Sequence, residues 1–343
     1  MKPSRALSAR FLNERKHLVA SLNRELARHT AAADTTRAAA WPDAAHLARW
    51  QKSAAHRLTT LLGWPLTDSA KPKVKTSWRT LGRDALGELR LVRFGVTGEY
   101  GSFAALFLPA KPRTTPPPLV IALHGGLGTI EKIAGLGHPT RNYNDLVTRL
   151  RRRHCAVLVP QLPLWRDHAE PYCAIEDLTA RLNLLGHNSP ALQTLTLRRA
   201  LDAALAVPAL RTAPVGLAGL SYGGCYGLYA AALDPRIRCL VTSAFFNDRH
   251  TYPNPAAVAL GLAQSFLDAE LAALVCPRAL WIETGDKDEL FTPSGARLEA
   301  KKVRALYRAT GHAARFHFEV FRGTHEFNRA EANLDFLLHA LGE

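Results

Sequence analysis

The sequence predicts an α/β protein with a largely parallel sheet that is covered by helices on both faces. Short, continuous apolar runs at residues 119–123 and 156–160 are typical of strands buried on both sides. Segments with helical periodicity, such as residues 145–153 and 191–206, lie between and after these runs. Strands that alternate with helices of this length favour a parallel sheet, because each parallel connection needs a crossover segment.

Residues 1–78 are expected to form a helical extension packed on the main domain. Residues 1–30 place leucines near helical spacing with charged residues between them, and residues 31–40 are interpreted as a small, polar connection. Residues 44–62 carry an apolar stripe and are followed by a glycine and a proline that end the helix. The stripe consists of Leu47, Trp50, Ala54, Leu58 and Leu61. We interpret it as a docking face against the main domain.

Residues 79–343 are expected to form one α/β domain, which follows a linker containing proline and lysine at residues 66–78. The expected strands cover residues 89–94, 103–108, 119–123, 156–160, 214–218, 239–242, 280–283 and 316–321. The expected helices cover residues 145–153, 191–206, 222–233, 298–309 and 327–341. With 343 residues, the chain is long enough to bury a large core of this kind.

The net charge of +15 is uneven, since residues 1–93 hold 18 Lys and Arg against 7 Asp and Glu. Such an excess can mark an anionic partner, such as nucleic acid or a membrane surface. These basic residues are spread along the segment with few aromatic residues between them, which favours a solvated, arginine-rich surface. We therefore expect neither a nucleic-acid partner nor a membrane partner, and the oligomeric state stays open.

The chain is expected to be cytoplasmic, because charged residues within residues 11–16 interrupt any secretory signal, unless a leader has been cleaved from it. The five cysteines are scattered without C-x-x-C spacing, which suits reduced, packed thiols. No zinc-binding pattern or H-E-x-x-H pair occurs in the sequence. We therefore expect neither a metal nor an organic cofactor.

Residues 215–224 read V-G-L-A-G-L-S-Y-G-G, with an apolar strand-like run leading in and a helix-like run leading out. Ser221 lies between Gly219 and Gly223 in the pattern G-x-S-x-G, which is typical of a nucleophile elbow. In such a turn the serine backbone is strained, and side chains at the two glycines would clash with neighbouring elements. The alternative is a glycine-rich turn with a solvated serine, but the strand before it and the helix after it favour the elbow.

A serine nucleophile needs a base, and the base needs a carboxylate that orients it. In chains with this motif, the carboxylate follows the serine and precedes the histidine base. The turn after the strand at residues 280–283 contains four acids: Glu283, Asp286, Asp288 and Glu289. We favour Asp288, which lies beyond the carboxyl end of the strand, with Asp286 as the alternative. The other acids of this turn are expected to be solvated. His325 lies between the last strand and the last helix, where the base is required.

Residues 124–128 read H-G-G-L-G after a buried strand, and such a loop can direct backbone N–H groups at a developing negative charge. We assign one oxyanion donor to Gly126, with Gly125 as the alternative, and the other to the N–H of Tyr222. His124 is interpreted as a structural hydrogen-bonding residue. The loop lacks the Lys and Ser/Thr of a phosphate-binding P-loop.

Five motifs carry a resemblance to a known family: L-H-G-G at 123–126, G-L-S-Y-G-G at 219–224, C-P-R-A-L at 276–280, G-D-K-D at 285–288 and G-T-H-E-F at 323–327. Over roughly residues 80–343 the chain resembles the α/β-hydrolase superfamily, closest to its acetyl xylan esterase-like and dienelactone hydrolase-like branch. This branch borders the prolyl oligopeptidase catalytic domain. The resemblance implies a mostly parallel eight-stranded sheet with one antiparallel strand, and its G-x-x-D pattern supports Asp288. Dienelactone hydrolases carry cysteine at the elbow, whereas this chain carries Ser221.

The residues together predict a serine carboxylic-ester hydrolase that acts through an acyl-enzyme, with Ser221, His325 and Asp288 as its triad. The class of substrate is inferred from three side chains: Trp165 as a sugar-stacking platform, Arg166 as a carboxylate partner and Phe245 in an apolar acyl pocket. Trp165 is equally well explained as loop packing. We expect small acyl esters, such as acetylated carbohydrates.

Two other functions remain open at this point. A serine peptidase or amidase of the prolyl oligopeptidase type usually carries a propeller, and residues 1–78 are too short and too helical for one. A non-catalytic hydrolase-fold protein could bind an anionic partner through its basic N-terminal segment. The complete set of serine, acid, histidine and glycine loop argues against that second alternative.

Overall fold

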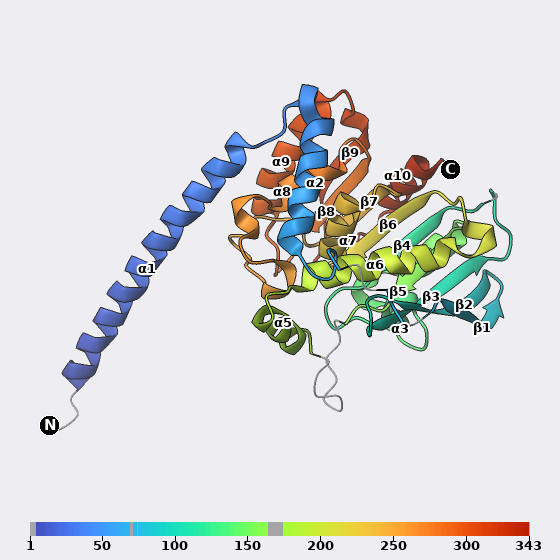
Figure 1. Cartoon of the computed structure of the whole chain (residues 1–343), viewed down its shortest axis with the longest axis horizontal. Helices are drawn as coiled ribbons and strands as arrows, with labels where there is room; N and C mark the ends of the chain where they lie inside the picture. The colour runs from blue at the N-terminus through green and yellow to red at the C-terminus, as the bar shows by residue number, and fades with distance from the viewer. Residues whose placement is uncertain (1–4, 69–70, 74, 115, 164–173, 343) are drawn as a thin grey trace.

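The computed structural model describes residues 5–68, 71–73, 75–114, 116–163 and 174–342. A nine-stranded sheet crosses the centre of the molecule (Figure 1). Its strands are β1 (Ser77–Asp84), β2 (Gly87–Gly95), β3 (Gly101–Pro109), β4 (Leu119–Leu123), β5 (Ala156–Pro160), β6 (Val215–Leu220), β7 (Ile237–Ser243), β8 (Ala279–Gly285) and β9 (Phe316–Phe321). Their order in the sheet is β1-β2-β3-β5-β4-β6-β7-β8-β9.

The strands from β5 to β9 in this order pair in parallel, whereas β1, β2 and β3 are joined as antiparallel neighbours and β3 also runs antiparallel to β5. The predicted α/β class with a mostly parallel sheet is therefore confirmed. The sheet has nine strands where eight were expected, because β1 is an additional strand at one edge. All eight residues of β1 are exposed, so the strand has no alternation of buried and exposed positions from which it could be predicted.

Helices cover both faces of the sheet (Figure 1). They are α1 (Arg5–Ala39), α2 (Leu47–Leu62), α3 (Ile130–Ala134), α4 (Leu146–Arg152), α5 (Ile175–Leu184), α6 (Ser189–Leu205), α7 (Tyr222–Leu233), α8 (Asp268–Val275), α9 (Pro293–Ala309) and α10 (Ala332–Leu341). Helices α2, α6, α7, α8 and α9 share one core, and α3, α4 and α10 share the other. Among the described residues, no helix combines the length and apolar character that a bilayer-spanning helix needs.

Side chains alternate between the two cores along the buried strands. On β4, Ile121 packs into the core with α6 and α7, whereas Val120 packs into the core with α3 and α10. Both side chains are almost fully buried. A strand that is buried on both faces has to be apolar throughout, and this explains the continuous apolar runs in the sequence.

Helix α1 is longer than expected and projects away from the body of the protein (Figure 1). The predicted connection at residues 31–40 is helical as far as Ala39, since its many alanines favour a helix. Residues 8–29 are exposed on every side of the helix. The expected packing of residues 1–78 on the main domain is therefore corrected: α2 and the last turns of α1 pack there, and residues 8–29 do not.

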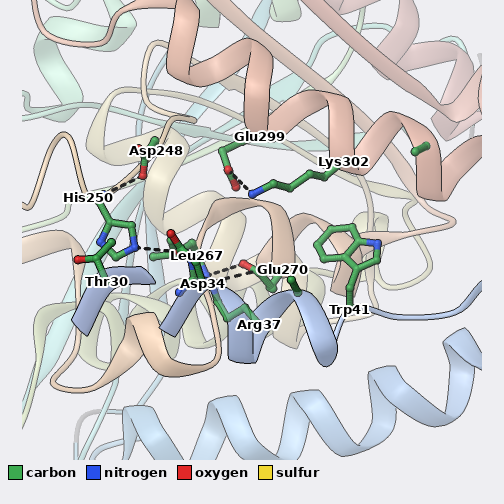
Figure 2. Close-up of a pocket in the computed structure, with 12 residues that line it drawn as sticks. Thr30, Asp34, Arg37, Trp41, Asp248, His250, Leu267, Glu270, Glu299 and Lys302 are labelled. Atoms are coloured by element: carbon green, nitrogen blue, oxygen red, sulfur yellow. Dashed lines mark hydrogen bonds and ion pairs between the residues drawn. The ribbon is translucent and has the colours of Figure 1, made fainter. Parts of the chain in front are cut away.

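The end of α1 is attached to the body through ion pairs around the buried Arg37 side chain (Figure 2). The Arg37 side chain is 5% exposed, pairs with Asp34 and lies 3.6 Å from the Glu270 carboxylate. Asp34 in turn lies 3.4 Å from His250. These contacts border a cavity of about 580 Å³, to which Trp41 also contributes. They attach α1 at one end only.

Helix α2 packs the stripe that the sequence predicts against the core, with Trp50 and Leu61 half-buried at its margin. Leu47, Ala54 and Leu58 are buried and belong to the core that also contains α7 and α8. The helix ends at Gly63, whose φ of +64° is left-handed and favours glycine. The Asn188 side chain donates a hydrogen bond of 2.8 Å to the Leu62 carbonyl and so satisfies one of the last carbonyls of α2.

Candidate active site

Ser221 occupies the sharp turn between β6, a strand in the middle of the sheet, and α7. Its φ of +58° lies in the left-handed region, which non-glycine residues rarely adopt. The Ser221 N–H donates a hydrogen bond of 2.8 Å to the Ser243 carbonyl at the end of β7. The sheet thus holds the serine in a strained conformation, and such strain is concentrated at functional sites.

The glycines on either side of Ser221 are required by close backbone contacts. A Cβ atom on Gly219 would lie 2.4 Å from the Gly223 carbonyl oxygen. A Cβ atom on Gly223 would lie 2.5 Å from the Leu123 carbonyl oxygen at the end of β4. No side chain fits at these distances, so the G-x-S-x-G spacing reflects the packing of α7 against β4 and β6.

The structure brings His325 and Asp288 together, although 37 residues separate them. The His325 Nδ1 atom lies 3.2 Å and 3.1 Å from the two carboxylate oxygens of Asp288. The Asp288 side chain is fully buried, and its Oδ1 atom accepts hydrogen bonds from the N–H groups of Leu290 (2.9 Å) and Phe291 (3.0 Å). The Phe291 ring stacks on the imidazole at 5.8 Å between centroids. The ring of His325 is therefore held from two sides.

The remaining acids of this turn have other roles. Asp286 is exposed and accepts a hydrogen bond of 2.9 Å from the Gly323 N–H, so it braces the loop that carries His325. Glu289 is exposed. Glu283, which was expected to be solvated, is 1% exposed and accepts a hydrogen bond of 3.0 Å from the Asn328 N–H. Burial raises the pKa of the Glu283 carboxyl. The expectation for Glu283 was wrong because its side chain points into the core between β8 and α10.

Two backbone N–H groups near Ser221, those of Gly126 and Tyr222, have no acceptor among the residues that the structure describes. The Gly126 N–H donates no hydrogen bond to any residue that the structure describes, whereas the Gly125 N–H donates to the Tyr143 hydroxyl at 3.1 Å. The Tyr222 N–H is the first of α7, and the first N–H groups of a helix have no acceptor within it. The positive end of the helix dipole favours negative charge at the same point.

His124 is a buried hydrogen-bonding residue and is not arranged as a base. Its Nε2 atom accepts a hydrogen bond of 3.1 Å from the Leu162 N–H, so the neutral ring carries its proton on Nδ1. Nδ1 lies 3.0 Å from the Gly125 carbonyl oxygen, to which it donates. Burial lowers the pKa of His124 to about 4, so the ring is neutral at neutral pH. These contacts join the loop after β4 to the residues after β5.

A cleft of about 550 Å³ contains the candidate groups: Ser221, Tyr222, Gly126 and His325 are among the residues that line it. Its volume is in the range of small-molecule sites. The cavity at the end of α1 shares none of its lining residues with this cleft (Figure 2). The chemistry-bearing side chains are therefore assembled at the carboxyl edge of the sheet, away from α1.

The predicted substrate-binding residues are only in part placed by the structure. Trp165 and Arg166 lie outside the described residues. Phe245 is buried and is not among the residues lining the cleft. Its ring packs against Tyr222, at 6.4 Å between centroids, and against Phe291, at 5.0 Å. Phe245 therefore supports the wall of the cleft from behind, and the expectation that it faces the acyl group is corrected.

No motif in the sequence indicates that residues 140–145 belong to the site. Tyr143 accepts the hydrogen bond from Gly125, and the Asn142 carbonyl accepts one of 2.8 Å from the Phe327 N–H. The Asn144 side chain donates a hydrogen bond of 2.6 Å to the Phe327 carbonyl. The segment thus ties the loop at residues 124–128 to the loop of His325. Its asparagines favour left-handed turns, but that signal names no partner for the turn.

No family model matches the sequence, and no curated protein matches it. Solved structures do match. A protein from Bacteroides fragilis NCTC 9343, with a provisional assignment as an acetyl xylan esterase, aligns with a TM-score of 0.67 and 13% identity over 82% of this chain and 77% of that chain. A methylesterase aligns with a TM-score of 0.67 and 17% identity over 89% of this chain and 67% of that chain.

A glucuronoyl esterase from Solibacter usitatus aligns with a TM-score of 0.57 and 16% identity, over 80% of this chain and 88% of that chain. At these identities the likeness concerns the fold, because folds host more than one function. The chain therefore has the α/β-hydrolase fold, and esterases are among the solved structures that it resembles.

Proposed function

We propose that the chain is a serine carboxylic-ester hydrolase that acts on small acyl esters, such as those of acetylated carbohydrates. One observation carries this proposal. A strained serine, a histidine held by a buried carboxylate and two free N–H groups face one cleft. These are the parts that acyl transfer needs, and the fold shared with esterases supports an ester as the substrate.

In the proposed reaction, Ser221 Oγ attacks the ester carbonyl while His325 Nε2 accepts its proton. The N–H groups of Gly126 and Tyr222 stabilise the tetrahedral oxyanion. His325 then gives the proton to the leaving alcohol, and the acyl group stays on Ser221. Water, activated by the same histidine, hydrolyses this acyl-enzyme and releases the acid. The reaction requires no cofactor.

Asp288 has a positioning role in this mechanism. Its contact with Nδ1 keeps the Nδ1–H tautomer, so Nε2 is free to accept the proton of Ser221. The carboxylate also stabilises the imidazolium that forms. Among the described residues, His325 bonds through Nδ1 to Asp288 and forms no hydrogen bond with Ser221. Catalytic hydrogen bonds of this kind commonly tighten only when the substrate binds.

The test is hydrolysis of p-nitrophenyl acetate by the wild type and by the variants Ser221→Ala and His325→Ala. Each variant is expected to lose about 10³-fold or more in kcat, because either change removes the nucleophile–base pair. His339→Ala, an exposed histidine on α10, serves as the matched control and should keep full activity.

Labelling with a fluorophosphonate followed by mass spectrometry should locate the modification on Ser221, since this reagent captures activated serines. An inactive wild type on short esters, or a Ser221→Ala variant with unchanged turnover, would contradict the proposal. Labelling at another serine would move the site elsewhere.

A further inference from the structure

The cleft that holds Ser221 has a cationic rim. Among the described residues that line it, Lys132, His138 and Arg141 carry basic side chains in addition to His325, and none is an aspartate or glutamate. All three basic side chains are exposed to solvent at the mouth of the cleft. The Asp288 side chain is fully buried behind His325 and does not line the cleft.

Neither Lys132 nor Arg141 forms an ion pair with any residue that the structure describes. The Lys132 ammonium donates one hydrogen bond, of 2.7 Å, to the Leu127 carbonyl and keeps its other protons free. Glu131 is the acid that lies near His138. The charges of Lys132 and Arg141 are left without a carboxylate partner.

The other acids near the rim are engaged elsewhere. The Asp145 carboxylate accepts a hydrogen bond of 2.6 Å from the Thr140 hydroxyl. The Glu326 carboxylate accepts one of 2.7 Å from the Asn144 side chain and pairs with Arg329 at 3.3 Å. A cleft with apolar walls and uncompensated positive charge concentrates anions at its mouth.

Arg141 is held in place by its backbone. Its φ of +47° lies in the left-handed region, where a non-glycine residue is strained. The segment is tied on one side to the oxyanion loop through Tyr143 and on the other side to Phe327 through Asn144. A side chain on a segment that is fixed in this way loses less entropy on binding than one on a free loop. The backbone of Arg141 is therefore fixed at the lining of the cleft.

We infer that the natural ester carries an anionic group, such as a carboxylate, on its alcohol part, and that Arg141 and Lys132 bind this group. The inference rests on the proposed esterase function, because it names the substrate class of that same cleft. A guanidinium binds a carboxylate through two parallel hydrogen bonds, and a lysine beside it adds a point charge. With a small acyl group at Ser221, the alcohol part extends to the rim, where these cations lie.

The experiment compares two acetate esters of the same shape, 3-acetoxybenzoate and 3-acetoxybenzamide, which differ in the negative charge. The measured quantity is the ratio of their kcat/KM values, corrected for their hydroxide-catalysed rates. In the wild type this ratio is expected to favour the anionic ester by about 10-fold, which corresponds to one or two exposed charge contacts. The preference should shrink as salt rises from about 0.02 M to about 0.5 M.

Arg141→Gln and Lys132→Gln should each lower the ratio by about 2- to 5-fold, since each variant removes one charge contact. The matched control is Lys301→Gln, which removes the same charge from an exposed position on α9 outside the cleft lining and should leave the ratio unchanged. Equal ratios in the wild type, Arg141→Gln and Lys132→Gln would overturn the inference and leave the esterase function standing.

The proposed esterase function itself would be contradicted by a different result, the absence of Ser221-dependent hydrolysis of both esters. Calorimetric titration with the product pair, 3-hydroxybenzoate and 3-hydroxybenzamide, then tests the anion site without any turnover. Tighter binding of the benzoate that is lost in Arg141→Gln supports the site. Equal binding of the two products, or no binding of either, overturns it.

Discussion

Replacing Asp288 by asparagine tests the geometry of the site with the smallest change in shape. The Oδ1 atom of Asp288 accepts two backbone hydrogen bonds, from Leu290 and Phe291. In Asp288→Asn the amide oxygen must keep this position, because an NH₂ group there would face two donors. The NH₂ group is then directed at His325 Nδ1, which has to become an acceptor. The proton moves to Nε2, and the ring can no longer accept the proton of Ser221.

This wrong tautomer is expected to lower kcat for p-nitrophenyl acetate by about 10⁴-fold, with a smaller effect on KM. The loss corresponds to about 5 kcal/mol of transition-state stabilisation, at about 1.4 kcal/mol for each factor of ten. The melting temperature should change little, because both backbone hydrogen bonds to Oδ1 are retained.

The matched control is Asp286→Asn, two positions away in the same turn. Asp286 is exposed, and the oxygen of an asparagine can still accept the hydrogen bond from the Gly323 N–H. This variant should stay within about 3-fold of the wild type, as expected for an exposed polar substitution. The reasoning is refuted if Asp288→Asn keeps more than a tenth of the wild-type kcat, or if Asp286→Asn is the more damaged of the two.

Three further predictions concern Tyr143, His124 and the projecting part of α1. Tyr143→Phe leaves the buried Gly125 N–H without its acceptor and should lower kcat by about 3- to 10-fold, measured with the short ester at unchanged KM. His124, with a pKa of about 4 in the fold, contributes stability above its unfolded pKa of about 6.5 that is lost as the pH falls towards 4. Between pH 7 and pH 5 this loss is about 2 kcal/mol in urea unfolding, and His124→Gln should lack that part of the pH dependence. Deleting residues 5–29 removes only the projecting part of α1, and calorimetry should show a melting temperature within about 2 °C of the wild type, because almost no buried surface is lost.

The burial of Glu283 shows how a sequence pattern can mislead about a single side chain. Four acids in one short turn suggest a solvated loop, and this holds for Asp286 and Glu289. Glu283 belongs to the strand that precedes the turn, and its side chain accepts hydrogen bonds from the Trp281 side chain at 2.8 Å and the Asn328 backbone at 3.0 Å. Composition reports what surrounds a residue in the chain, whereas burial depends on which face of the strand it occupies.

The structural features that have local causes could be predicted from the sequence. Continuous apolar runs predicted the buried strands β4 and β5 at their observed bounds, because a strand covered on both faces must be apolar throughout. The spacing of Gly219, Ser221 and Gly223 predicted the elbow, since each glycine is required by a backbone contact at that turn. The edge strand β1 escaped prediction because its exposed side chains leave no period in the sequence.

The contacts between segments that are distant in the chain can be seen only in the folded structure. Asp288 and Asp286 are two residues apart in one turn, and the fold alone shows that Asp288 faces His325. The contact between Asn144 and Phe327 joins residues that are 183 positions apart, and it places Arg141 at the mouth of the cleft. Hydrophobic periodicity and secondary-structure propensity indicate how each segment is buried. Which loops lie next to each other depends instead on the order of the strands in the sheet. That order is set by the packing of the whole chain.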